Sequence, residues 1–321
     1  IADNYEAVTG TPSLATNPGG FDAINIYGDE YQASNDLTSS LPWLFPGIGV
    51  WHRPGYKEID LVDYGTRNIK ANAALHFRTN PVKKDESPEL ILGGNFGSGT
   101  TVYQGDNRFS LRDILFFQGK IEFRKRDKFF IRAYFTQDDA GNSYDPYFTA
   151  LKLQELSKSN RFWSTDYINV WQRVYEPKIF ESGYPRLKVM VDPNGNFTTS
   201  FDQAAATQWI NTHQELLKQY HSEAAALAQK GNPLFNTQDA YEVGTARFDE
   251  AFNQIRNTYN NEGGTRFYDN SALYHAHGEY KFTPSFVNTW TVGGNMRLYA
   301  PDSRGTIFYD TAGTKITNFE F

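Results

Sequence analysis

The sequence predicts an all-β membrane barrel fragment, a curved antiparallel sheet of about six to eight strands with a long loop insertion that contains α-helices. The first observation is a hairpin at 114–136, where apolar and polar side chains alternate with period two around a turn at 125–128. The second is that several other stretches show the same alternation. The third is that short turns and long connections alternate along the chain.

Composition limits the alternatives. The chain has 321 residues, a formal net charge of −6 and a mean hydropathy of −0.60. No apolar run approaches the ~20 residues of a membrane helix, so a membrane role requires strands, which give no hydropathy peak because half of each strand is polar. The mild acidity and the absence of a basic stripe argue against nucleic acid as a partner. Cys is absent, which excludes disulfides and Cys-based zinc sites.

Residues 1–67 are expected to form a loop-rich segment that leads into the sheet, because Gly, Pro, Asn, Asp and Ser are abundant in residues 1–55. A short strand is expected within 56–64. The chain does not begin with Met and its first residues do not resemble a signal peptide. We therefore expect an internal piece of something longer.

Barrel hairpins are predicted over residues 68–136. Apolar residues there alternate with charged or amide residues, which is typical of a strand with one apolar and one polar side. Residues 98–113 are predicted to be a loop, because they are rich in Gly and polar residues. The strands predicted in this segment are 68–79, 89–97, 114–124 and 129–136.

Residues 137–270 are predicted to form a long extracellular loop insertion, because a connection of this length has structure of its own in a compact protein. Helices are predicted at 202–229 and 239–259, where apolar residues recur at helical spacing. A shorter helical turn is predicted at 166–175.

Residues 271–321 are predicted to form a barrel hairpin and a following loop. The strands at 272–282 and 289–298 are joined by a tight turn at 283–285. Across the whole chain, the turns after the first, third and fifth strands are short and the connections after the others are long. Outer-membrane barrels have short turns at one rim and long loops at the other, so this sorting favours a barrel over a soluble sandwich.

Several phrases of the sequence resemble the barrel of TonB-dependent outer-membrane receptors of the Bacteroidetes group. They extend over nearly the whole chain and are barrel and loop phrases, not catalytic signatures. The phrases lie at 27–30, 58–64, 66–68, 99–108, 139–144, 305–308 and 316–320.

The resemblance implies a receptor in the bacterial cell outer membrane that takes up a nutrient, such as a siderophore, a glycan or a peptide. A full receptor has a barrel of about 22 strands, a plug that binds substrate and a segment that contacts the TonB energy-coupling complex. We expect neither part in this chain, which would then be a piece of the wall that cannot transport alone. The implied partners are outer-membrane lipid, the TonB complex through the missing N-terminal parts, and a surface lipoprotein.

No catalytic, cofactor-binding or metal-binding residue is predicted. His275 and His277 share a strand face with Glu279, but a metal site needs convergent ligands at bonding distance, and lumen-facing His is the commoner case. The acidic turn at 138–145 lacks the ordered pattern and distal Glu of an EF-hand calcium loop. No Ser lies in a nucleophile-elbow context and no carboxylate pair stands out, so we do not expect an enzyme.

Five side chains are candidate ligand contacts. Trp163, Trp171 and Tyr175 lie in the insertion, where aromatic rings can stack on ligands such as sugars. The preferred interpretation is that they form the small core that its helices require. Arg78 and His76 lie on the polar strand side, which would line a wet lumen crossed by ion pairs.

Two other classes of protein are kept as hypotheses. A soluble all-β carbohydrate-binding or adhesion module with a helical insertion predicts that the apolar strand faces pack together as two sheets. A receptor predicts that these faces point outward. Glycines on the apolar face fill a core poorly, which favours the receptor; they are Gly94, Gly119, Gly278 and Gly294. A secreted hydrolase has only the chain length and the aromatic content in its favour.

Overall fold

The computed structural model of the chain describes residues 26–28, 37–83, 86–104, 108–311 and 316–321. Much of the predicted loop-rich segment 1–67 therefore lies outside the described residues. The chain divides into two compact units. We call them the helical unit, residues 1–61 and 147–252, and the sheet unit, residues 62–146 and 253–321.

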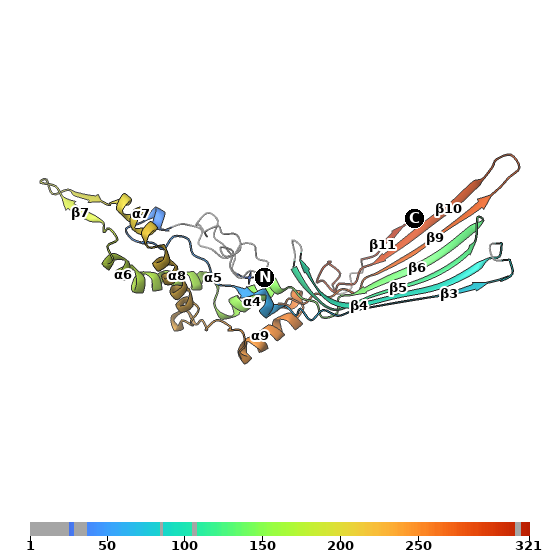
Figure 1. Cartoon of the computed structure of the whole chain (residues 1–321), viewed down its shortest axis with the longest axis horizontal. Helices are drawn as coiled ribbons and strands as arrows, with labels where there is room; N and C mark the ends of the chain where they lie inside the picture. Colours follow the sequence, from blue (N-terminus) through green and yellow to red (C-terminus); the bar gives the residue numbers. More distant parts are fainter. Residues whose placement is uncertain (1–25, 29–36, 84–85, 105–107, 312–315) are drawn as a thin grey trace. The chain divides into compact units, whose positions relative to one another are not determined.

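The sheet unit is built on one antiparallel sheet of seven strands in the order β11-β10-β9-β6-β5-β4-β3. Figure 1 shows these strands side by side in a single open layer. Each strand pairs with its neighbours in sequence, and β6 pairs directly with β9 although residues 140–271 separate them. The strands are β3 (Asn68–Arg78), β4 (Glu89–Gln104), β5 (Arg108–Lys125), β6 (Phe129–Asp139), β9 (Ala272–Phe282), β10 (Trp290–Ala300) and β11 (Asn318–Glu320).

The predicted fold class is confirmed in its antiparallel sheet and its helical insertion and is corrected in two respects. The chain is a mixed α and β protein rather than all-β, because helices form most of the described part of the helical unit. The sheet is neither closed nor curled, since β3 and β11 are its two edges and each pairs with one neighbour. Closure requires the first and last strands to pair along their length, and β11 has three residues against eleven in β3.

The loop predicted at 98–113 is wrong. β4 continues to Gln104 and β5 begins at Arg108, with a bulge between Gly99 and Thr101. The glycines of this stretch resemble loop signals, but the β-branched and aromatic residues at 100–103 continue the ladder. The predicted long connection after the second strand therefore shrinks to 105–107, which lies outside the described residues. The predicted alternation of short turns with long connections therefore holds for two of its three turn–connection pairs and not for the first.

The predicted helices occur with different bounds. The helix at 202–229 is two helices, because His213 takes a non-helical conformation and caps both of them. The helix at 239–259 begins only at Ala246, after Gly244, which has a φ of 82°. The short turn at 166–175 is the middle of a much longer helical segment at 160–181.

The other described elements are short strands and helices. None of the described helices is both long enough and apolar enough to cross a membrane. These elements are β1 (Ile26–Tyr27), α2 (Leu37–Ser40), β2 (Tyr56–Lys57), α3 (Glu58–Leu61), α4 (Pro146–Ser157), α5 (Asn160–Val170), η1 (Trp171–Tyr175), α6 (Glu176–Glu181), β7 (Lys188–Val191), β8 (Phe197–Ser200), α7 (Gln203–Thr212), α8 (Gln214–Ala228), η2 (Pro233–Phe235), α9 (Ala246–Asn257) and η3 (Asn260–Glu262).

The core of the helical unit is an aromatic stripe at a spacing of four residues. Trp163, Tyr167, Trp171, Tyr175 and Ile179 are all buried in one cluster. Such a stripe advances by about 40° per step around an α-helix of 3.6 residues per turn. The π-helical turn η1 lies in the middle of the stripe and takes more residues per turn, so it rotates the stripe back toward the same partner, α8.

Several polar groups in this core hydrogen-bond to backbone or side-chain partners. Trp171 Nε1 donates to the Pro46 carbonyl at 3.0 Å, and Tyr175 Oη donates to Glu223 at 3.0 Å. Lys158 is almost fully buried and donates to Asp166 at 2.6 Å and to the Ala228 carbonyl at 2.8 Å. This cation therefore joins Asp166 in the middle of α5 to the last carbonyl of α8, where a helix dipole favours positive charge.

Candidate functional site

The apolar side of the seven-stranded sheet is exposed. Alternate residues along each strand share a face, and many large side chains of the apolar face are exposed. In β3 the residues of both faces are exposed. Leu75 is 60% exposed, Ile121 49%, Ile131 64% and Val292 57%. In a water-soluble antiparallel sheet such a face packs on a core, whereas among the described residues of the sheet unit no second sheet covers it.

Aromatic side chains border this apolar face at both ends. At the short-turn end, ring contacts run along a row of Phe123, Phe129, Tyr280 and Phe282, with successive centroids 5.4, 6.3 and 4.6 Å apart. At the other end the row is Phe117, Phe135 and Tyr274, with centroids 5.5 and 6.3 Å apart. Six residues of strand separate Phe117 from Phe123, or about 20 Å at 3.4 Å per residue.

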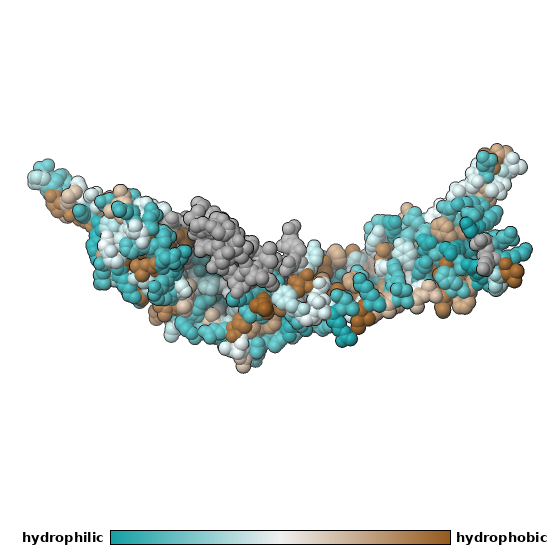
Figure 2. All heavy atoms as spheres, viewed as in Figure 1, coloured by the Kyte–Doolittle hydropathy of each residue, from teal (hydrophilic) through white to brown (hydrophobic). Residues whose placement is uncertain are grey.

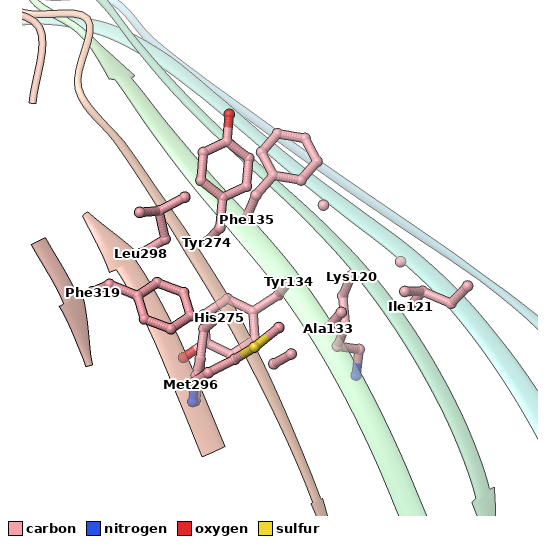
Figure 3. A pocket seen from close by; sticks show the side chains of 13 residues that line it. Lys120, Ile121, Ala133, Tyr134, Phe135, Tyr274, His275, Met296, Leu298 and Phe319 are labelled. Atoms are coloured by element: carbon pink, nitrogen blue, oxygen red, sulfur yellow. The ribbon is translucent and has the colours of Figure 1, made fainter. Parts of the chain in front are cut away.

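Small residues form the floor of a hollow that Phe135 and Tyr274 of the second aromatic row help to line (Figure 3). The hollow has a volume of about 550 Å³. Gly119 faces Phe135 across the β5–β6 ladder, and an added Cβ there would meet the phenyl ring at 2.4 Å. Ala133 and Ala276 continue the floor, and larger side chains form the walls. These walls include Ile121, Phe135, Tyr274, Met296, Leu298 and Phe319.

The opposite side of the sheet is polar and is organised around two carboxylates. Glu89, on β4, accepts from His76 Nδ1 at 3.0 Å, from Arg78 Nε at 3.3 Å and from Arg124 Nη2 at 2.9 Å. These groups come from three adjacent strands, because Arg78, Glu89 and Arg124 stand opposite one another in register. His76 and Arg78, two of the candidate ligand contacts, are therefore held as partners of Glu89.

Glu122, on β5, is the second carboxylate and its side chain is 3% exposed. It accepts from Arg132 Nε at 3.0 Å and from Lys120 Nζ at 3.3 Å, and Arg124 Nη1 lies 3.8 Å away. A buried carboxylate is stable only with such partners. The predicted ion pairs across the polar side of the sheet are confirmed, while the lining of a wet lumen by this side stays a prediction. The sequence analysis did not single out Glu89. The signal that could have identified it is its position opposite Arg78 and Arg124 in the register of the two hairpins.

The two histidines of β9 lie on the same polar side. His275 and His277 stack with ring centroids 5.0 Å apart, and each meets an aromatic ring of β6, Tyr134 at 4.8 Å and Phe130 at 5.0 Å. Arg132 stands opposite His277 in register, which disfavours a bound cation. No group of three His, Cys, Asp or Glu in the described part of the chain could hold a metal.

The aromatic candidate contacts lie in the core of the helical unit. Trp163 and Trp171 have no exposed surface, and Tyr175 is 2% exposed. Burial and the nearby Glu223 carboxylate raise the pKa of Tyr175 to about 12. The interpretation of these rings as a core agrees with their burial, while ligand contact by them stays a prediction. These three aromatic residues belong to the helical unit, whereas His76 and Arg78 belong to the sheet unit.

Comparison with known proteins adds no relative. No known protein family, no curated protein and no solved structure matches this chain.

Proposed function

We propose that the sheet unit is a wall segment of an outer-membrane β-barrel, with its apolar side toward lipid and its polar side toward a wet lumen. The observation that carries the proposal is the exposure of the apolar side together with the burial of Glu89 and Glu122 on the other. A soluble sheet would instead bury its apolar face against a core.

Two further features support this orientation. Aromatic rows border a band of aliphatic and small residues, as they do at the two interfaces of a membrane barrel. The ion pairs on the polar side also suit a lumen, because alternate residues of a barrel strand face water.

The open edges β3 and β11 carry unpaired backbone groups, which lipid cannot satisfy. The proposed wall therefore requires additional strands.

The function that follows is part of a TonB-dependent receptor that takes up a nutrient too large for diffusion pores. Residues 147–252 of the helical unit then belong to a long extracellular loop. Recognition of the nutrient and coupling to energy would depend on a plug, on further strands and on a TonB-contact segment. The chain's own part is to form wall and outer loop.

Fractionation of the cells that make the protein tests this proposal. The protein is expected in the outer-membrane fraction, retained after alkaline carbonate washing and released by detergent. Carbonate removes proteins held only by surface charge, so the wash separates an inserted wall from an adsorbed domain. Recovery in the soluble fraction, or release by carbonate, would contradict the proposal and favour a soluble carbohydrate-binding or adhesion module.

A further inference from the structure

A cluster of charged side chains lies on the polar side of β3, β4, β5 and β6. Four cations and two carboxylates are joined there by ion pairs, and hydrophilic residues are prominent over these strands (Figure 2). Arg124 connects the two halves, because it lies 2.9 Å from Glu89 and 3.8 Å from Glu122. We call this set the cationic cluster. Its members are Arg78, Glu89, Lys120, Glu122, Arg124 and Arg132.

The cationic cluster carries more positive than negative charge. Hydrogen bonds from His76 and Arg124 lower the pKa of Glu89 to about 2, so this carboxylate is ionised at neutral pH. Burial acts to raise the pKa of Glu122, but hydrogen bonds from two of the cations lower it overall. Four cations against two ionised carboxylates leave a net charge of +2.

The cations are the accessible part of this cluster. Their side chains are 34–47% exposed, whereas those of the two carboxylates are 3–9% exposed. A solute that approaches the polar side therefore meets guanidinium and ammonium groups before it meets a carboxylate. The surface that the cluster presents to water is more positive than its net charge alone indicates.

Other charges on the polar side do not extend this positive surface. On β9, Glu279 lies 3.8 Å from Lys281, and on β11, Glu320 lies 3.7 Å from Arg297 of β10. Asp138 lies near the end of β6 that is remote from the cluster. The excess of positive charge is therefore local to one area of the sheet.

The width of the cationic cluster limits what it can bind. Its outermost strands, β3 and β6, are three strand spacings apart in the sheet, which is about 14 Å. A single phosphate or carboxylate group is too small to contact cations at both edges. A solute with two separated carboxylates can contact Arg78 and Arg132 together, and its two negative charges match the net charge of +2.

We infer that the cationic cluster binds a solute with two carboxylate groups, which is the chemical class of nutrient for the proposed receptor. Arginine donates to a carboxylate through a fork of paired N–H groups, and Lys120 adds a point charge. The inference rests on the proposed function, because it takes the polar side to face a wet lumen that a solute enters.

Titration of the protein with matched anions tests the inference. The protein is extracted in neutral detergent from the membranes of the cells that make it. The probes are an oligo(ethylene glycol) with a carboxylate at both ends, the same chain with a carboxylate at one end, and inorganic phosphate. Isothermal titration calorimetry measures binding. We expect the dicarboxylate to bind about tenfold more tightly than the monocarboxylate, because a second charge-assisted contact forms. High salt should weaken binding, because it screens exposed charges.

A double variant removes the excess charge and keeps the buried pairs. Arg78→Gln with Lys120→Gln brings the cluster to neutrality, while Arg124 still pairs with Glu89 and Arg132 with the other carboxylate. Dicarboxylate binding should weaken by about tenfold, since each exposed ion pair contributes up to about fivefold. Recovery of the variant in the outer-membrane fraction checks that it folds.

Two controls accompany this variant. Arg78→Lys with Lys120→Arg keeps the charge and should retain most of the affinity. Arg161→Gln with Lys188→Gln removes one arginine and one lysine that are exposed in the helical unit, and should leave binding unchanged.

The outcomes separate this inference from the proposed function. Equal affinity for the two ethylene glycol probes, or an unchanged affinity in the Arg78→Gln, Lys120→Gln variant, would overturn the dicarboxylate site while the protein stays in the membrane. Inorganic phosphate that binds as tightly as the dicarboxylate would also overturn it, because a single compact anion would then be sufficient. Absence of the protein from membranes would overturn the proposed function and, with it, the role of the dicarboxylate as a nutrient.

Discussion

The two units bury the same kinds of side chain in opposite places. Trp171 of the helical unit is fully buried, whereas Trp290 of β10 is 55% exposed. Lys158 of the helical unit is buried against Asp166, and the carboxylates of the sheet unit are buried on its polar side. One chain thus contains a unit with an apolar interior and a unit with an exposed apolar face, and the proposed membrane wall accounts for this difference.

The largest effect is expected in the aromatic stripe. Trp171→Ala removes a fully buried indole and its hydrogen bond to Pro46, and should destabilise the helical unit by about 5 kcal/mol. Trp290→Ala is the matched change in the sheet unit and should leave the helical unit's stability unchanged. Urea unfolding followed by far-UV circular dichroism measures both. Equal losses of unfolding free energy in the two variants would contradict the contrast between a buried Trp171 and an exposed Trp290.

Removal of the buried cation should be nearly as harmful. Lys158→Met leaves the Asp166 carboxylate without its cation, which should cost about 4 kcal/mol. The double variant Lys158→Met with Asp166→Leu should recover most of this loss, because no unpaired charge then stays buried. A double-mutant cycle on urea unfolding gives the coupling energy, and a coupling near zero would show that the pair contributes nothing.

A charge on the apolar side distinguishes the two environments. Ile121→Arg places a cation in the middle of the proposed lipid-facing band and should disfavour the membrane-inserted state by about 3 kcal/mol. The control Lys120→Arg, on the polar side of the same strand, should have no such effect. The yield of folded protein in the outer-membrane fraction measures the difference. Normal insertion of the Ile121→Arg protein would count against lipid contact at that position.

The smallest effect is a pH dependence of the helical unit. Burial lowers the pKa of His221 from 6.5 to about 4, and its ring stacks on Trp171 with centroids 4.5 Å apart. The unfolded state therefore binds a proton more readily than the folded state. Stability should fall by about 2 kcal/mol as the pH is lowered from 6.5 to 4, less than the full shift because the residue is partly exposed.

The control for this pH dependence is His221→Gln, which cannot titrate. Its urea midpoint should change less between neutral and acidic pH than that of the unsubstituted protein. An identical decline in both proteins would assign the acid sensitivity to other groups.

Much of the sheet was predictable from the sequence, because period-two alternation fixes both strand position and face. The strands at 68–79 and 272–282 match β3 and β9 to within one residue. The continuation of β4 to Gln104 was missed because glycine is both a loop signal and a bulge residue. The strand β11 was missed because three residues hold too little alternation to detect.

The aromatic stripe was less accessible to sequence reasoning. The stripe depends on a π turn at Trp171–Tyr175, for which the residues carry no local signal. The stripe also needs α8 as its packing partner, and the pairing of α5 with α8 is set by tertiary contacts, not by local spacing.

Cysteine scanning in the cells that make the protein shows directly whether the apolar side of the sheet faces lipid, because the chain has no cysteine of its own. Single cysteines replace Lys120, Ile121, Ala74 and Leu75 in the natural protein and are spin-labelled. The account predicts that labels at 121 and 75 collide with oxygen dissolved in lipid, and that labels at 120 and 74 collide with a water-soluble nickel complex. If labels at 121 and 75 reached neither reagent, or only the nickel complex, the apolar side would not face lipid.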